Sequence, residues 1–480
     1  MLASAAILAL PLIVVTADQS LAFTCESVTN PAGGNGGAID NGDASNTACG
    51  TLAVANGSLA TAIGHDSGAN ATDSTAVGAH SDVHFQAPGG VAVGRTAEVH
   101  QFASGGVAIG RNADVGIGAE SGVAIGENAD VDNVRAIAIG RNAHASGERS
   151  IATGSNANAA GGRSVAIGAE SDAFALDSLA VGYLSQAHSQ SATAVGTGAT
   201  AAGVGNTAFG SGAQAFDPGA FLAGTGITAI GQNAHAHANN TTSVGAESFA
   251  LGANSTAFGQ DAEVHSTNGT AMGQQSRSLA NGATAYGQNA VAQGVDSTVV
   301  GRNSYASSTN GTAVGVGALA LNANSTAIGR GAVTDADNQM VYGTIDETHR
   351  MAGITSATSV ARQTGSLEVV TSDSGGRLAT DGGAIFDTLD SHDDRIDKNE
   401  SGVALALAVE NPDLVGDERF GLAVNWGGFE GSSAIGGAFM GVLANNIFDA
   451  NRGRFAVSGG VGVGVNEGTV GGRVGGQLTW

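Results

Sequence analysis

The chain is short of the residues on which most folds rely. Its 480 residues include 2 cysteines and 5 prolines, only 4% are aromatic and 12% are charged, and Lys398 is the one lysine. This composition argues against a large aromatic-rich core, but it suits thin layers of small aliphatic side chains. Phosphate binding needs clustered lysine and arginine, so the formal net charge of −24 argues against a nucleic-acid partner.

Glycine is abundant, with 77 residues, and many of these glycines end a repeated phrase. The phrase is clear in Ser164-Val165-Ala166-Ile167-Gly168. Its final glycine recurs with a period of 14 from position 126 to position 329, apart from one step of 21 after position 210. Upstream, the glycines at positions 78, 94, 110 and 126 step by 16. A fixed period means stacked units that share a core, so the sequence predicts a solenoid.

Each unit reads as a short strand, a polar turn that often contains asparagine, a second short strand and another turn. Strand side chains alternate, so the residues one and three places before the glycine share a face. In the phrase above these are Ile167 and Val165, and we expect this apolar face to point inward. Ala166 lies on the opposite face, where its small size predicts the close approach of a second surface.

The repeated S/T-x-A-V/I-G units resemble the head repeats of the trimeric autotransporter adhesins, the YadA-like family, over roughly residues 50–343. The resemblance implies an all-β chain with a short coiled coil. Its parts are a left-handed parallel β-roll head at 23–343, a neck and connector at 344–383, a trimeric coiled-coil stalk at 384–410 and an outer-membrane β-barrel anchor at 411–480. Three such heads pack side by side in the family, and the small alanine face is compatible with that packing.

Irregular units in the repeat predict surface loops, where binding residues concentrate. The three units between the glycines at positions 78 and 126, which we call the wide units, each gain two residues, and the step of 21 adds seven. The candidate adhesive residues in these loops are His84, Phe85, His100, Phe102, Phe216, Pro218 and Phe221. The alternative is that the inserted residues are neutral and have no part in adhesion.

Heptad spacing predicts a short coiled coil in the stalk. The expected core positions are Ile385, Leu389, His392, Ile396, Asn399 and Val403. A polar seam residue such as Asn399 costs stability but fixes register and strand number. A solvated linker helix is the alternative.

Four runs of alternating residues follow Asn411-Pro412 and predict membrane-spanning strands. In the last run Val474 and Trp480, the barrel terminus, share the apolar face, and Arg473 and Gln477 lie on the opposite face toward the lumen. Four strands cannot close, because membrane barrels have at least about eight strands and lipid does not tolerate an open edge. Several copies must therefore share one barrel, and the resemblance implies three copies and twelve strands. A soluble β-meander is the alternative.

The apolar run at residues 5–15, followed by Ser20-Leu21-Ala22, predicts a signal peptide at 1–22, although no lysine or arginine precedes residue 95. A buried N-terminal helix is the alternative. Cys25 and Cys49 follow, and in an exported chain they form either a disulfide that staples the N-terminal cap or two buried thiols.

No catalytic constellation stands out, so we expect neither an enzyme nor a cofactor. His235 and His237 share a strand face, and a threefold axis could gather more imidazoles for a metal. Most histidines fall in the polar half of a repeat, which favours solvated side chains over a metal site. These histidines are His84, His100, His144, His188 and His265.

The first functional hypothesis is therefore a homotrimeric adhesin of the outer membrane that exposes its head at the cell surface. Its expected partners are other copies of itself, the membrane and an unidentified extracellular ligand such as a matrix protein or another cell. The alternative is an ice- or crystal-binding solenoid, because threonines recur in register from Thr193 to Thr326. We expect those threonines to point inward with Ile, Val and Phe, and outward threonines would favour this alternative. A polysaccharide-cleaving solenoid would need acids in register on neighbouring rungs, and no such column is evident.

Overall fold

The computed structural model describes residues 23–25, 37–39, 41, 43, 45–448 and 452–480. The predicted signal peptide at 1–22 therefore lies outside the described residues. The chain divides into two compact units, Met1–Glu347 and Thr348–Trp480, and each is described by itself.

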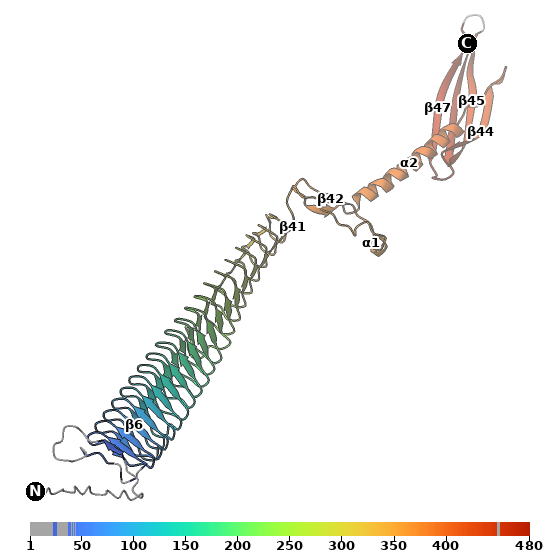
Figure 1. Cartoon of the computed structure of the whole chain (residues 1–480). Coiled ribbons are helices and arrows are strands. Elements are labelled where there is room, and N and C mark those ends of the chain that lie inside the picture. Colours follow the sequence, from blue (N-terminus) through green and yellow to red (C-terminus); the bar gives the residue numbers. More distant parts are fainter. Residues whose placement is uncertain (1–22, 26–36, 40, 42, 44, 449–451) are drawn as a thin grey trace, which may run out of the picture. The chain divides into compact units, whose positions relative to one another are not determined.

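The first unit is a parallel β-solenoid in which nearly every turn adds one strand to each of two sheets (Figure 1). Sheet A has 22 strands, most of three residues, and sheet B is a ladder of two-residue strands. Neighbouring strands pair in register at the repeat period, as Val165 with Leu179 and Ala166 with Ala180. The predicted solenoid is confirmed.

The strands of sheet A are β1 (Phe23–Cys25), β2 (Thr47–Cys49), β4 (Thr61–Ile63), β6 (Thr75–Val77), β8 (Val91–Val93), β10 (Val107–Ile109), β12 (Val123–Ile125), β14 (Ile137–Ile139), β16 (Ile151–Thr153), β18 (Val165–Ile167), β20 (Leu179–Val181), β22 (Thr193–Val195), β24 (Thr207–Phe209), β26 (Thr228–Ile230), β28 (Thr242–Val244), β30 (Thr256–Phe258), β32 (Thr270–Met272), β34 (Thr284–Tyr286), β36 (Thr298–Val300), β38 (Thr312–Val314), β40 (Thr326–Ile328) and β41 (Met340–Tyr342).

The strands of sheet B are β3 (Val54–Ala55), β5 (Gly68–Ala69), β7 (Asp82–Val83), β9 (Glu98–Val99), β11 (Asp114–Val115), β13 (Asp130–Val131), β15 (His144–Ala145), β17 (Asn158–Ala159), β19 (Asp172–Ala173), β21 (Gln186–Ala187), β23 (Thr200–Ala201), β25 (Gln214–Ala215), β27 (His235–Ala236), β29 (Phe249–Ala250), β31 (Glu263–Val264), β33 (Arg277–Ser278), β35 (Val291–Ala292), β37 (Tyr305–Ala306) and β39 (Leu319–Ala320).

The solenoid core consists of alanine, and the prediction that Ile167 and Val165 point inward is wrong. Ala166 has no exposed surface, and the corresponding alanines of most other rungs are buried with those of sheet B in three successive clusters. Each rung is so thin that the two sheets meet through methyl groups, which leaves no room for branched side chains on both. The small alanine face is therefore the inside of the rung, and the second surface predicted to approach it is sheet B of the same chain.

The large side chains of sheet A form a column on the outside, which we call the apolar column. Its most exposed members are Ile63, Ile109, Ile139, Ile167, Phe209, Ile230, Phe258, Tyr286, Val300 and Tyr342. The threonines from Thr193 to Thr326 lie on the same outward face and are half-buried, so the expectation that they point inward is also wrong.

The turns behave as their residues predict. Asn112, Asn128 and Asn142 have φ of 54° or 55°, and each amide donates to the asparagine of the next rung at 2.9–3.0 Å. The glycine that ends each phrase is required by both space and conformation. Gly182, for example, has φ of 132°, and a Cβ there would lie 2.6 Å from the carbonyl oxygen of Gly196.

At the N-terminal end of sheet A, β1 pairs with β2 in parallel, and Cys25 is the register partner of Cys49. Cys49 is disulfide-bonded, and Cys25 is the only other cysteine in the sequence. The alternative of two buried thiols is therefore wrong for Cys49.

The second unit contains α1 (Ala357–Arg362), a hairpin of β42 (Val370–Ser372) and β43 (Leu378–Thr380), and the long helix α2 (Ala384–Ala408). A four-stranded antiparallel sheet follows, made of β44 (Phe420–Phe429), β45 (Ser432–Phe448), β46 (Arg452–Gly464) and β47 (Val470–Thr479). The four predicted strands are confirmed. Within the described residues, no helix has the length and apolar character needed to cross a membrane.

The C-terminal end of α2 lies against the glycine-rich face of this sheet. Ala404, Leu405 and Ala408 are buried there. A Cβ on Gly436 would lie 2.6 Å from the carbonyl oxygen of Ala408, and one on Gly471 would lie 2.8 Å from Leu405 Cδ2. Glycine on this face lets the helix approach the sheet backbone directly.

Candidate functional site

The outer face of sheet B carries most of the chemistry of the head. In nearly every two-residue strand the first side chain points outward and the second is buried. The residue after the strand points outward again because strand side chains alternate. Two outward columns therefore run side by side along the solenoid, and two clusters stand out on them.

The first cluster, the acid–histidine strip, covers the three wide units and the next rung. It consists of Asp82, His84, Glu98, His100, Asp114, Asp130, Asp132 and His144. Asp82, Glu98, Asp114 and Asp130 are paired in register on neighbouring strands. Sequence reasoning found no such column of acids, and that conclusion is wrong. These acids recur at the 16-residue spacing of the wide units and not at the common period of 14, and the strand pairing shows that they are in register.

The histidines of this strip contact the acids directly. His84 Nε2 lies 2.6 Å from Glu98 Oε1, and His100 lies 3.2 Å from Asp114 through its Nε2. The two imidazole rings stack with centroids 5.0 Å apart and an interplanar angle of 13°. On the last rung His144 Nε2 lies 2.8 Å from Asp132 Oδ2. The strip is a network of half-buried groups, not a row of solvated side chains.

Crowding perturbs the acids of the strip. Burial raises the pKa of Asp114 to about 6, with the neighbouring acids adding to the shift and His100 opposing it. Burial also raises the pKa of Asp82, and it raises the pKa of Asp130, where the charge of Asp132 contributes further.

The second cluster, the aromatic strip, runs along sheet B on both sides of the long unit. It consists of Phe174, His188, Phe221, Phe216, His237, His235 and Phe249. Consecutive rings in this order have centroids 4.9–5.1 Å apart, and Phe174 stacks on His188 with an interplanar angle of 13°. The rings form one continuous chain of contacts across the outer face of the sheet.

The seven extra residues of the long unit supply the middle of this strip. Asn206 holds the loop in place: its side-chain amide donates to the Gly224 carbonyl at 3.1 Å and its side-chain oxygen accepts from the Ile227 amide at 3.1 Å. Ile227 returns the chain to the core, where it is 1% exposed. The insertion thereby folds Phe221 back onto His188 of an earlier rung.

The imidazoles in the aromatic strip are poor bases. Burial lowers the pKa of His188 and of His235. For His237, burial and the neighbouring His235 together lower the pKa to about 4, against a weaker opposing effect of Asp217. These rings are therefore neutral at pH 7 and act as planar, weakly polar surfaces. The metal alternative for His235 and His237 has no carboxylate or cysteine cluster to support it among the described residues.

The structure brings some of the predicted adhesive residues together and separates others. His84 and His100 meet in the acid–histidine strip, and Phe216 and Phe221 meet in the aromatic strip. The remaining candidates are Phe85 and Phe102, which occupy the turns beside the first strip and are more than half exposed, and Pro218, which is exposed in the long loop.

Sequence reasoning missed two members of the aromatic strip, Phe174 and Phe249. Each lies one repeat period away from a histidine of the strip, Phe174 from His188 and Phe249 from His235. That spacing was the available signal, because residues one period apart occupy neighbouring rungs.

A family model for the YadA head domain repeat matches the solenoid in repeated segments. The matched residues are 55–81, 118–143, 132–157, 145–171, 159–185, 175–199, 228–248, 239–262, 250–276, 265–290, 292–318, 306–332 and 320–338. The matched segments all lie in the solenoid, which is therefore built from YadA-type head repeats. No curated protein sequence matches it.

Among solved structures, the collagen-binding domain of the Yersinia adhesin YadA aligns with this YadA-like chain. The alignment covers 56% of this chain and 97% of the other, with 15% identity and a TM-score of 0.13. The assignment of the head repeats rests on the family model and not on this superposition. The chain is thus an adhesin whose head is a β-roll of YadA-type repeats.

In this YadA-like chain the predicted stalk positions lie along one helix. Ile385, Leu389, Ile396 and Val403 of α2 are each 40–52% exposed. The other two stalk positions border a small hollow on the helix surface, which is lined by His392, Arg395, Ile396 and Asn399. In a single copy the four apolar side chains are partly open to solvent.

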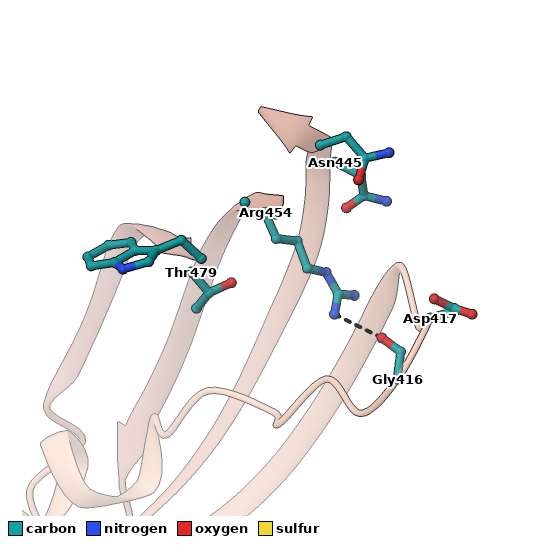
Figure 2. A pocket seen from close by; sticks show the side chains of 8 residues that line it. Gly416, Asp417, Asn445, Arg454 and Thr479 are labelled. Atoms are coloured by element: carbon teal, nitrogen blue, oxygen red, sulfur yellow. Dashed lines mark hydrogen bonds between the residues drawn. The ribbon is translucent and has the colours of Figure 1, made fainter. Parts of the chain in front are cut away.

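In the sheet, the predicted lumen residues Arg473 and Gln477 belong to β47 and are exposed, and Trp480 is 87% exposed. A shallow hollow lies at the end of the sheet near Trp480 (Figure 2). It is lined by Gly416, Asp417, Asn445, Asn446, Gly453, Arg454, Thr479 and Trp480. There the Arg454 guanidinium donates to the Gly416 carbonyl at 3.0 Å, which ties the loop before β44 to β46.

Proposed function

We propose that the chain is one subunit of a homotrimeric adhesin of the outer membrane. Three copies form a barrel of twelve strands, four from each, with the three α2 helices passing into it. The heads are exposed at the cell surface, where they attach the cell to matrix, other cells or solid surfaces.

The observation that carries this proposal is the open four-stranded sheet. Its outer strands β44 and β47 each pair with one neighbour, and neither has a second partner among the described strands. The face opposite α2 exposes large apolar side chains, each 60–80% exposed: Phe420, Leu422, Val424 and Trp426. An apolar outer face with open edges suits a barrel completed in lipid by further copies.

Two further exposed surfaces support association of copies. The apolar column of the head runs along sheet A, and the seam of α2 presents Ile385, Leu389 and Ile396 to solvent. Exposed apolar patches of this length mark interaction surfaces in soluble proteins. Both are repetitive, so identical copies can cover them in register.

For the ligand-binding surface we propose the aromatic strip. Planar rings on a rigid sheet give a large contact area with little loss of conformational entropy on binding. Phe174 and Phe221 are 41% and 38% exposed, so their faces are open to a ligand. The Yersinia domain named above is titled as collagen-binding, and immobilised collagen is included among the ligands to test.

Assembly is tested on outer-membrane fractions run on a denaturing gel with and without heating. We expect a heat-resistant band near three times the chain mass, lost on deletion of residues 403–480 and retained when the head is deleted instead. A chain recovered only as a soluble monomer would contradict the proposal.

Attachment is tested with cells that display the full chain on collagen-coated, fibronectin-coated and bare surfaces. We expect Phe174→Ala with Phe221→Ala to reduce attachment at least tenfold while the trimer band stays unchanged. Phe85→Ala with Phe102→Ala is the matched control, since these two rings are at least as exposed but lie outside the strip. If only the control pair reduces attachment, the loops of the wide units are the adhesive site.

The second candidate, ice or crystal binding, gains from the outward threonines. Thr193, Thr207 and Thr228 are register partners on neighbouring strands. The column beside them is uneven, with side chains of unequal size that suit a flat crystal plane poorly, such as Val195 and Phe209. Thermal hysteresis of the displayed or detergent-solubilised chain tests ice binding. Association of copies through the outer face of sheet A would cover the threonines and abolish ice binding.

A further inference from the structure

The acid–histidine strip contains a group of metal-binding side chains that the adhesin function does not use. His84, Glu98 and His100 each offer one ligand atom, and these atoms lie within 4.8 Å of one another. They come from three positions set by the strand register: Glu98 is the first residue of β9, and the two histidines follow β7 and β9 directly. The backbone of a rigid solenoid thus holds all three.

We propose that His84, Glu98 and His100 bind a zinc ion. Two imidazoles and a carboxylate are a common zinc ligand set, and the fourth position is open to water or to Asp82, whose Oδ2 lies 3.7 Å from His84 Nε2. This inference is independent of the adhesive ligand and of the aromatic strip.

The ligand atoms are near the separations of a zinc site, and the stacked rings of His84 and His100 must turn so that both nitrogen lone pairs point at one ion. Tetrahedral zinc with ligand bonds of about 2.0–2.2 Å places its donor atoms roughly 3.3–3.6 Å apart. His84 Nε2 and Glu98 Oε1 are already 2.6 Å apart, and His100 Nδ1 lies 3.7 Å from the same oxygen. Zinc would replace this direct contact between His84 and Glu98 with two metal–ligand bonds.

Asp114 provides an independent sign that the group is arranged for a ligand. Its Oδ1 is shielded from solvent and makes no hydrogen bond, although it lies 3.2 Å from His100 Nε2. A small rotation of the His100 ring toward a metal at Nδ1 brings the Nε2–H into line with this oxygen. A carboxylate that accepts from the distal nitrogen of a ligating histidine is the usual outer partner of a zinc site.

The acid–histidine strip contains a second group of possible metal ligands, which differs from the first in its ligand types. Asp130, Asp132 and His144 offer two carboxylates and one imidazole, also within 4.8 Å of one another. Nitrogen-rich sets favour zinc over magnesium and calcium, which prefer oxygen. We therefore assign zinc to the group with two histidines.

The test uses the full chain purified in detergent without a polyhistidine tag, titrated with Zn²⁺ alone in a calorimeter. We expect saturable binding of one ion per chain, absent in His84→Gln with His100→Gln. Asp114→Asn should keep the stoichiometry and weaken the affinity by about 10–100-fold, because it changes only the outer partner. Circular dichroism in the absence of metal checks that each variant keeps the solenoid.

His265→Gln is the matched control, since His265 lies on the same face 3.5 Å from Glu263 but, among the described residues, has no second histidine in such a group. It should bind Zn²⁺ as the unmodified chain does. Two results would overturn the proposal. One is the absence of saturable binding by the unmodified chain, and the other is binding that survives in the double variant and disappears with His144→Gln.

Discussion

Gly122 lies against Val131 across the interior of the solenoid: a Cβ added to the glycine would be 2.8 Å from Val131 Cγ1. Three other glycines lie as closely against a valine that precedes them in sheet B: Gly90 against Val83, Gly106 against Val99 and Gly269 against Val264. After four of the five strands of sheet B that bury a valine, a glycine precedes the next strand of sheet A, where many other rungs have serine or alanine. The volume of each rung is conserved by pairing a larger residue with a smaller one.

Gly122→Ala should therefore destabilise the head by about 1–3 kcal/mol, the usual range for overpacking a core. Val131→Ala introduced together with it should restore part of the loss, because the two changes share one space. Ser164→Ala is the control: it occupies the equivalent position in a rung with an alanine core, and its hydroxyl oxygen is buried without a hydrogen-bond partner. Urea denaturation followed by circular dichroism measures the unfolding free energy of the single variant, the double variant and the control. Equal losses of stability in Gly122→Ala and Ser164→Ala would contradict the packing of Gly122 against Val131.

A second prediction separates the inside of a rung from its outside. Ala166→Leu should destabilise the head strongly, since Ala166 is fully buried between the sheets. Ile167→Ala, one residue further along and 43% exposed, should change the unfolding free energy of a single copy by only about 0.5 kcal/mol. It should instead weaken association of the heads, measured as a loss of the heat-resistant trimer in a chain whose anchor is intact.

The glycine-lined face of the C-terminal sheet leads to a third prediction. Gly436→Val should prevent α2 from lying on the sheet, because even a Cβ there would be 2.6 Å from the Ala408 carbonyl oxygen. We expect loss of the heat-resistant band from the outer-membrane fraction. Gly437→Ala is the matched control on the other face, where a Cβ meets only the Ala423 carbonyl oxygen at 3.9 Å. Unchanged assembly of Gly436→Val would show that the helix does not need this contact.

A fourth prediction concerns acidification of the aromatic strip. The folded state lowers the pKa of His237 to about 4, whereas the unfolded chain has the ordinary value near 6.5. Below about pH 6.5 the unfolded state takes up a proton that the folded state resists, so this histidine's contribution to stability is lost as the pH falls toward 4. Relative to His237→Gln, the unmodified head should therefore lose stability between pH 7 and pH 4. Parallel pH profiles of the two thermal midpoints would contradict the assignment.

Much of the architecture could be predicted because repeats encode their own register. The spacing of the final glycines predicted the solenoid, the asparagines predicted turns at positive φ, and alternation after Pro412 predicted four strands. The error lay in the direction of the side chains. Alternation says that Ala166 and Ile167 face opposite ways, but it does not say which way is inward, and the larger residue is the usual choice for a core.

The candidate sites were less accessible to sequence reasoning. In the acid–histidine strip the two histidines of the wide units were identified from their unusual spacing, but Glu98 and Asp114 drew no attention because acids are common on polar turns. In the aromatic strip the insertion itself was found, whereas Phe174 was missed although it stacks on His188 of the next rung, and the contact of Phe221 with His188 depends on the loop folding back. Contacts between rungs depend on strand register and loop path, which no local pattern specifies.

The sequence by itself determined that this protein is a stack of nearly identical rungs followed by a helix and four strands, because period and alternation are local properties of the chain. The tertiary structure decided what faces inward and which side chains meet. In a rung only two strands thick, the space between the sheets admits methyl groups and excludes larger pairs. That limit on volume places alanine inside and leaves the larger side chains on the surface.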